Sequence, residues 1–140
     1  MSTPYSATYS PPAPVVEVLF GKPGERPATG PLEATFDTGA DMTVVPKSIL
    51  LDLGAPSMFE ARLRSSWGDL HEVMIYLSDL QIGPALLVGV YLAGDETAEE
   101  ITIGRNVLNK LSIWLDGPKQ VTDILDDATI SRLRGRREAE

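Results

Sequence analysis

Short apolar runs, each followed closely by glycine or proline, constrain most strongly what this chain can fold into. The runs at 15–20, 32–36 and 101–103 are rich in β-branched and other apolar residues, which is typical of strands. The 140 residues include 12 Gly and 11 Pro, and these punctuating residues favour strands and turns over long helices. Because this length suits one domain, we predict a single mostly-β domain.

Three further stretches extend this prediction. Apolar and polar residues alternate from His71 to Leu77, which with 61–64 indicates a hairpin that has one face in water. The continuous apolar run 85–92 fits a strand covered on both faces. The segments 112–115 and 120–125 flank a turn sequence and predict a second hairpin.

Two short helices are expected between these strands. Residues 47–53 suit one or two helical turns, with Gly54 as the stop, and a second short helix is predicted to begin at Gly104 and run through Leu111. The domain is therefore expected to span residues 15–125.

The two ends of the chain differ from this domain. Residues 1–14 contain four prolines and no charged side chain, so we predict an extended or disordered arm. Residues 126–140 contain four arginines and are expected to be a solvated, charged tail, although an Arg-rich segment can also recruit a partner.

Composition excludes several kinds of site. The formal charge of −8 argues against a nucleic-acid-binding protein, and the absence of Cys excludes disulfides and thiolate metal sites. His71 is the single histidine of the chain, and no metal-ligand or nucleophile pattern surrounds it. No metal or cofactor is therefore expected. No apolar run suits a membrane span and the N-terminus lacks a signal core, which indicates a soluble, cytoplasmic protein.

One motif carries chemistry: Phe36-Asp37-Thr38-Gly39-Ala40-Asp41, which directly follows a predicted strand. Taken alone, it is also compatible with an ordinary turn, where Asp and Gly are common. Further along the chain, after the predicted hairpin with Ser65-Ser66-Trp67-Gly68 at its tip, comes Ile103-Gly104-Arg105-Asn106-Val107-Leu108.

In this order the pieces resemble the retropepsins, the single-domain aspartic proteases typified by retroviral protease, with cellular and bacterial relatives. The resemblance spans roughly Val15 to Leu125. It implies a closed β-barrel-like fold with one flap hairpin and one or two short helices. It also implies an endopeptidase that cleaves an extended peptide.

The chemistry of such a site requires a dimer. One ionised carboxylate activates water while a protonated one polarises the peptide carbonyl, and two aspartates about 3 Å apart achieve this by sharing one proton. This chain has a single Asp-Thr-Gly, so the second aspartate has to come from a second copy. Residues 113–115 are candidates for either the dimer interface or the core.

The resemblance assigns roles to individual residues. Asp37 is the expected catalytic carboxylate, Thr38 is expected to form hydrogen bonds across the dimer, and Gly39 allows close backbone approach. Asp41 and Arg105 match a family ion pair that supports the catalytic loop. Substrate contacts are expected from the catalytic loop, the flap tip and the strand before Gly104, that is from Gly39, Ala40, Asp41, Ser66, Trp67, Gly68 and Thr102.

Several alternatives stay open at this stage. Thr102 would make a substrate pocket more polar if it lines one, but it can equally face a backbone acceptor. An acidic rim at Glu96, Glu99 and Glu100 would attract basic peptides, or it is simply a solvated loop. Ala40 cannot donate a hydrogen bond to an ionised aspartate, so we predict activity at mildly rather than strongly acidic pH.

The same motifs also fit two non-enzymatic functions. A module of this fold can hold peptide in the dimer cleft without turnover. A structural dimer can recruit a partner through its arm or tail. The intact Asp-Thr-Gly favours catalysis, because a binding module does not need all three residues.

Overall fold

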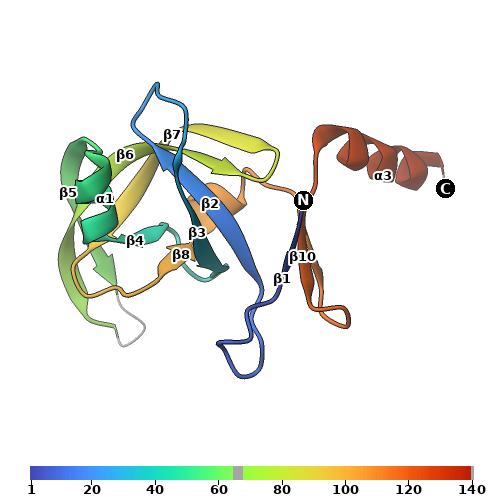
Figure 1. The fold of residues 1–140 in the computed structure, drawn as a ribbon, viewed down its shortest axis with the longest axis horizontal. Coiled ribbons are helices and arrows are strands. Elements are labelled where there is room, and N and C mark those ends of the chain that lie inside the picture. Colours follow the sequence, from blue (N-terminus) through green and yellow to red (C-terminus); the bar gives the residue numbers. More distant parts are fainter. Residues whose placement is uncertain (65–67, 140) are drawn as a thin grey trace.

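The structure is a computed structural model that describes residues 1–64 and 68–139, and strands dominate it (Figure 1). Its elements in chain order are β1 (Ser2–Pro4), β2 (Val15–Gly21), β3 (Thr29–Phe36), β4 (Val44–Pro46), α1 (Lys47–Leu53), β5 (Ser57–Arg64), β6 (Leu70–Ile82), β7 (Ala85–Asp95), β8 (Ile101–Ile103), α2 (Arg105–Leu108), β9 (Ile113–Asp116), β10 (Val121–Ile124) and α3 (Asp127–Ala139).

Six of these strands close into a barrel. Hydrogen-bonded neighbours follow the order β2-β3-β8-β4-β7-β6, and β6 pairs back with β2 from Val18↔Ile82 to Gly21↔Asp79. The pairs β3–β8 and β4–β7 run parallel, while β5 pairs only with β6 and lies outside the ring. The predicted mostly-β, closed barrel is therefore confirmed.

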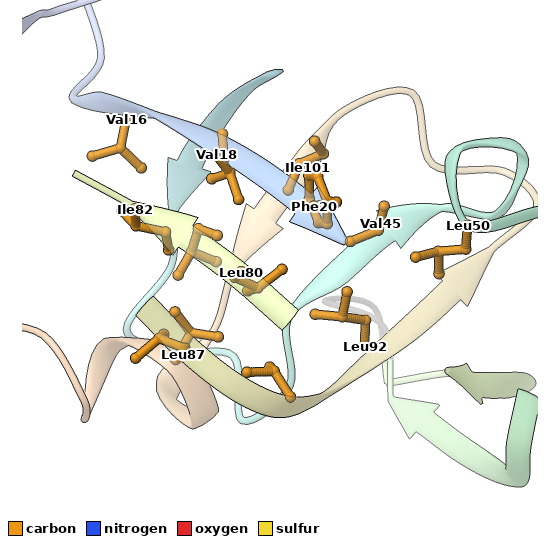
Figure 2. Packing of buried hydrophobic residues seen from close by; sticks show 14 of the residues in the cluster. Val16, Val18, Phe20, Val45, Leu50, Leu80, Ile82, Leu87, Leu92 and Ile101 are labelled. Carbon is orange, nitrogen blue, oxygen red and sulfur yellow. The ribbon is translucent and has the colours of Figure 1, made fainter. Parts of the chain in front are cut away.

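Apolar side chains fill the interior of this barrel. Alternation along β2 turns Val16, Val18 and Phe20 inward, and each is at most 1% exposed. They belong to one buried cluster with Leu80 of β6 and Leu92 of β7, as the close-up view shows (Figure 2). Burial of these side chains supplies the main driving force for closing the barrel.

Helix α1 occupies the residues that the sequence indicates, Lys47 to Leu53. It ends because Gly54 adopts a left-handed conformation at φ 74°, and the Gly54 N–H bonds back to the carbonyl of Leu51 at 3.0 Å. Leu50 anchors the helix in the core with no exposed surface.

The N-terminal arm is a strand where we expected an extended or disordered segment in residues 1–14. β1 pairs antiparallel with β10, from Ser2↔Asp123 to Pro4↔Val121, and Ser6 forms a further bridge with Ala13. Pro4 lacks an N–H, and the pairing continues through the N–H of Tyr5, which donates to the carbonyl of Gln120 at 2.9 Å. The partner strand lies about 120 residues away in sequence, so local composition gives no sign of it.

The C-terminal segment, expected to be a solvated charged tail, is helical, because residues 127–139 form α3. The Asp126 carboxylate accepts a hydrogen bond from the N–H of Thr129 at 2.8 Å, which caps the helix and holds the pKa of Asp126 below its usual value. The helix contains few apolar residues, so hydrophobic periodicity could not predict it. The residues of its first turns and middle are mostly exposed.

Residues 85–92 of β7 are covered on one face only, whereas the continuous apolar run predicted cover on both. Leu87, Val90 and Leu92 point into the core, but Leu86 and Val88 are 54% and 68% exposed. Neighbouring apolar residues on one strand alternate between faces, so a run of them does not by itself show that both faces are buried.

Candidate active site

Asp37 begins the loop that follows β3, at the point where the parallel pairing with β8 ends. Its N–H donates to the carbonyl of Ile103 at 2.9 Å and so continues the β3–β8 ladder by one residue. The Gly39 N–H donates to Asp37 Oδ1 at 2.8 Å, and the Ala40 N–H donates to the Asp37 carbonyl at 3.2 Å. The side chain of Asp37 is exposed, and Oδ2 accepts no hydrogen bond from the described residues.

Asn106 of α2 clamps the end of this loop through hydrogen bonds of its side-chain amide. Its Oδ1 accepts hydrogen bonds from both the backbone N–H and the hydroxyl of Thr43, at 2.9 and 2.8 Å. Its Nδ2 donates to the carbonyl of Tyr91 at 2.8 Å, which ties the loop to β7. Thr43 is fully buried, and its Oγ1 in turn accepts from the Gly104 N–H at 3.0 Å. These bonds fix the end of the loop that begins at Asp37.

Gly104 lets α2 approach the loop this closely. A Cβ atom at this position would lie 2.5 Å from both the carbonyl carbon and the carbonyl oxygen of Met42. Backbone atoms cannot move aside as a flexible side chain can, so the position requires glycine.

Arg105 supports the loop, but not through the predicted ion pair with Asp41. Its guanidinium Nη1 donates to the carbonyl of Thr38 at 2.8 Å, and its N–H donates to the carbonyl of Ala40 at 2.8 Å. No ion pair between Arg105 and Asp41 forms in the described structure, and the Asp41 carboxylate is exposed. The guanidinium instead satisfies a loop carbonyl that would otherwise face it unpaired.

A cleft of about 610 Å³ opens beside Asp37. The predicted residues Gly39, Ala40 and Asp41 line it, together with Arg105. Apolar residues of the floor and of the β5–β6 hairpin complete part of the wall, namely Met42, Val44, Leu63 and Leu70. The remaining lining residues are Arg62 and Arg64 of β5, which the sequence analysis did not single out.

Two predicted substrate-binding residues do not line this cleft. Thr102 is half-buried within β8 and does not line this cleft, and Gly68 is exposed at the start of the segment before β6. Ser66 and Trp67 fall outside the described residues. Thr38 is exposed on the loop after β3, where its carbonyl accepts a hydrogen bond from Arg105.

The acidic residues of the loop after β7 do not line the Asp37 cleft either. Glu96 forms an ion pair with Lys47 at 3.1 Å, which raises the pKa of that lysine. Glu100 accepts a hydrogen bond from the hydroxyl of Tyr9 in the N-terminal arm, which raises the pKa of Tyr9 to about 12. Two of the three predicted rim carboxylates are thus engaged by the protein itself.

Other kinds of site find little support in the described part of the chain. No group of three or more His, Cys, Asp or Glu side chains is placed to hold a metal ion there. Among the helices of residues 1–64 and 68–139, none has the length and apolar character needed to cross a bilayer. His71 lies with Glu72 on an exposed part of β6 and borders a separate hollow near Lys47.

The clamp formed by Asn106 and Thr43 is not predicted from the sequence, where Asn106 stands within Gly104-Arg105-Asn106 without an assigned role. A polar residue inside an apolar run is a signal for a buried hydrogen bond, but its partner is 63 residues away.

Comparison with solved structures identifies the fold. A retropepsin-like aspartic protease from Rickettsia conorii superimposes with a TM-score of 0.51 at 13% identity, covering 78% of this chain and 90% of that one. The retroviral protease-like domain of Ddi1 from Leishmania major gives a TM-score of 0.46 at 14% identity, covering 82% and 97% of the two chains.

A foamy viral protease-reverse transcriptase, solved with an RNA/DNA hybrid, gives a TM-score of 0.49 at 14% identity and covers 69% of this chain. The chain spans 12% of the length of that viral protein. No protein-family model and no curated protein sequence matches the chain. On the closed barrel and the Rickettsia superposition, this chain has the fold of a retropepsin-like aspartic protease.

Proposed function

We propose that this protein is a homodimeric aspartic endopeptidase in which Asp37 of each subunit supplies one catalytic carboxylate. The observation that carries the proposal is the position of Asp37, exposed on a rigidly clamped loop and facing a cleft. One carboxylate alone cannot act at the same moment as the base that activates water and as the acid that polarises the carbonyl. A second copy of the same loop supplies the missing group.

The mechanism follows from two such loops meeting on a two-fold axis. The pair of Asp37 side chains shares one proton, because two ionised carboxylates at close range repel each other. The ionised member takes a proton from a water molecule whose oxygen attacks the peptide carbonyl carbon, and the protonated member gives its proton to the carbonyl oxygen, so that a tetrahedral diol forms. The first carboxyl then passes its proton to the peptide nitrogen while the second takes one from the diol, and the C–N bond breaks to give a carboxyl and an amine product. The Gly39 N–H holds Oδ1 of its own Asp37 and so fixes the orientation of the carboxyl group.

The open edge of β5 suits an extended peptide. β5 pairs with β6 along one side only, and three consecutive residues from Arg62 to Arg64 border the cleft. Consecutive side chains of a strand point to opposite faces of the sheet. A cleft that contacts all three residues therefore follows the edge of the strand. An extended peptide laid there can form main-chain hydrogen bonds with the edge.

Exposed apolar residues on β9 support association of two copies. Trp114 and Leu115 are 55% and 50% exposed and are available for an interface, while Ile113 packs against the core. β9 is also an outer strand of its three-stranded sheet, with its second edge unpaired in the described structure. The turn between β9 and β10 points to the same side of the molecule as the C-terminal end of β5 and the N-terminal end of β6 (Figure 1).

The substitution Asp37→Asn tests the proposal directly. The purified wild-type protein is expected to cleave members of a peptide library, and Asp37→Asn is expected to reduce kcat/KM by about 10²- to 10⁴-fold or more, because it removes the acid–base group. Asp52→Asn, on the exposed end of α1, is the matched control and is expected to leave cleavage unchanged.

Sedimentation of both variants at several concentrations shows whether the loss comes with an intact dimer. Cleavage that survives Asp37→Asn would remove Asp37 from the mechanism. Peptide binding without any cleavage by the wild type would instead favour the peptide-binding module of the same fold.

A further inference from the structure

The Asp37 cleft contains more cationic than anionic side chains, although the protein as a whole carries a charge of −8. Arg62, Arg64 and Arg105 line it, against Asp37 and Asp41. In the proposed dimer the two Asp37 groups share a proton, so the pair carries about one negative charge for two clefts. The cleft is therefore a locally positive site on an acidic molecule.

Arg62 and Arg64 lie on the same face of β5. One residue, Leu63, separates them along the strand, which places their Cα atoms about 7 Å apart. Burial follows the same alternation, since both arginines are exposed while Ala61 and Leu63 are half-buried. A peptide that runs extended along β5 presents its own side chains with this spacing.

The two arginines differ in their cross-strand neighbours. Arg62 is opposite Glu72, and their charged groups lie 4.0 Å apart with both side chains about 70% exposed. An exposed pair at this distance interacts weakly. Arg64 is opposite Leu70 and forms no ion pair within residues 1–64 and 68–139.

Arg105, the third arginine of the cleft, is already hydrogen-bonded within the protein. The guanidinium of Arg105 donates to the carbonyl of Thr38 and so supports the catalytic loop. Of the three carboxylates that would favour a basic peptide, Glu96 and Glu100 are engaged by Lys47 and Tyr9, and Glu99, like them, does not line this cleft. The cationic groups free to meet a peptide in the cleft are consequently those of β5.

We infer that Arg64, assisted by Arg62, forms a carboxylate-binding subsite, so that the protein selects peptides with Asp or Glu opposite β5. The inference rests on the proposed endopeptidase function. A guanidinium binds a carboxylate through two parallel hydrogen bonds, which a neutral amide cannot match. Because the dimer is two-fold symmetric, the preference is expected at two positions, one on each side of the cleaved bond.

A cleavage profile from a peptide library at about pH 6, where peptide Glu is ionised, tests this inference. Peptides with Asp or Glu at one position on each side of the cut are expected to be enriched. A matched pair of peptides that differ as Glu and Gln at this position is expected to differ about three- to tenfold in kcat/KM, and the ratio should fall as salt is added.

The variant Arg64→Glu is expected to reverse the preference, favouring Lys over Glu at the same position. Arg62→Gln should weaken the preference for Glu by a smaller factor, since Glu72 already neutralises part of its charge. Arg26→Gln removes the same charge from the exposed turn between β2 and β3, outside the cleft, and should leave the Glu-to-Gln ratio unchanged.

Equal cleavage of the Glu and Gln peptides, or a preference that Arg64→Glu does not alter, would overturn the inference while leaving the protease intact. If the wild type cleaves nothing, the proposed function fails separately. In that case the affinities of fluorescent Glu, Gln and Lys peptides for wild type and Arg64→Glu, measured by anisotropy, decide whether the cleft selects carboxylates. Equal affinities overturn the inference there too.

Discussion

Gly104 is the residue at which a single added methyl group should disrupt the site most. In Gly104→Ala the new Cβ would lie 2.5 Å from the backbone of Met42, so the loop or α2 has to shift. We expect a loss of about 1–3 kcal/mol or more in the free energy of unfolding, as is usual for overpacking. Urea denaturation of the two proteins measures this difference.

Gly117→Ala provides the control for that experiment, because nothing lies within 4 Å of the Cβ position in the turn between β9 and β10. The midpoint of its urea denaturation should differ from that of wild type by no more than an ordinary surface substitution causes. A Gly104→Ala protein as stable and as active as wild type would contradict the close approach of α2 to the loop.

Ala40 is expected to set the acidic limit of activity. It lines the cleft next to Asp37, and its methyl group cannot donate a hydrogen bond to an ionised carboxylate. In Ala40→Ser a hydroxyl donor would favour the ionised form of the Asp37 pair, so the acid limb of the kcat/KM profile should move to lower pH. A wild-type profile that peaks below about pH 3 would contradict this expectation.

Individual residues were predictable from sequence where the chemistry is local. Asp37, Gly39 and Ala40 stand next to one another in a motif, and the structure places all three beside one cleft. Arg64 and Asn106 were not predictable, because their roles depend on strand pairing and on partners far away in the chain. The expected Asp41–Arg105 ion pair does not form in the described structure, where the guanidinium of Arg105 donates to the carbonyl of Thr38 instead.

At the scale of elements, Asn106 joins three parts of the molecule: the catalytic loop, β7 and α2. In Asn106→Ala the buried N–H and hydroxyl of Thr43 lose their acceptor, which costs about 1–3 kcal/mol for unpaired buried donors. We expect lower stability in denaturant and a further loss of kcat/KM at temperatures where the protein is still folded.

The exposed neighbour Asn109 offers a matched comparison, because its side chain forms no hydrogen bond in the described structure. Asn109→Ala should therefore leave both stability and cleavage close to wild type. Similar losses in the two variants would show that the clamp does not hold the loop.

Strands and helices with strong local signals were predicted well. The β-branched run at 15–20, the strand 101–103 and the helix 47–53 ended by Gly54 all form close to the expected bounds. The pairing of β1 with β10 and the helix α3 escaped prediction. The first depends on a distant partner strand, and the second is capped by one Asp126 hydrogen bond without an apolar face.

At the scale of the whole molecule, a shared active site can be distinguished from two independent ones by mixing subunits. When wild type and Asp37→Asn are combined in equal amounts and allowed to exchange, random pairing leaves about one quarter of the dimers with two Asp37 residues. The mixture should therefore retain about a quarter of the activity of an equal number of wild-type dimers. Independent sites would retain about one half.

Sedimentation of the mixture must show dimers for this comparison to hold, and a mixture with wild type and Asp52→Asn should keep full activity. Activity near one half in exchanged dimers would mean that each subunit cleaves on its own. The proposed pairing of carboxylates would then be wrong.

The position of β5 outside the closed ring has a consequence for how such proteins diversify. Among the described residues it pairs with β6 alone, so the exposed side chains of residues 57–64 can change without altering the pairing of the six barrel strands, whereas Ala61 and Leu63 pack against the core. If the proposed function holds, a lineage with this fold can change its preference for peptides by replacing a few exposed residues of β5, while the barrel that presents Asp37 stays the same. The exposed residues of β5 and the residues that pair the barrel strands can therefore change independently.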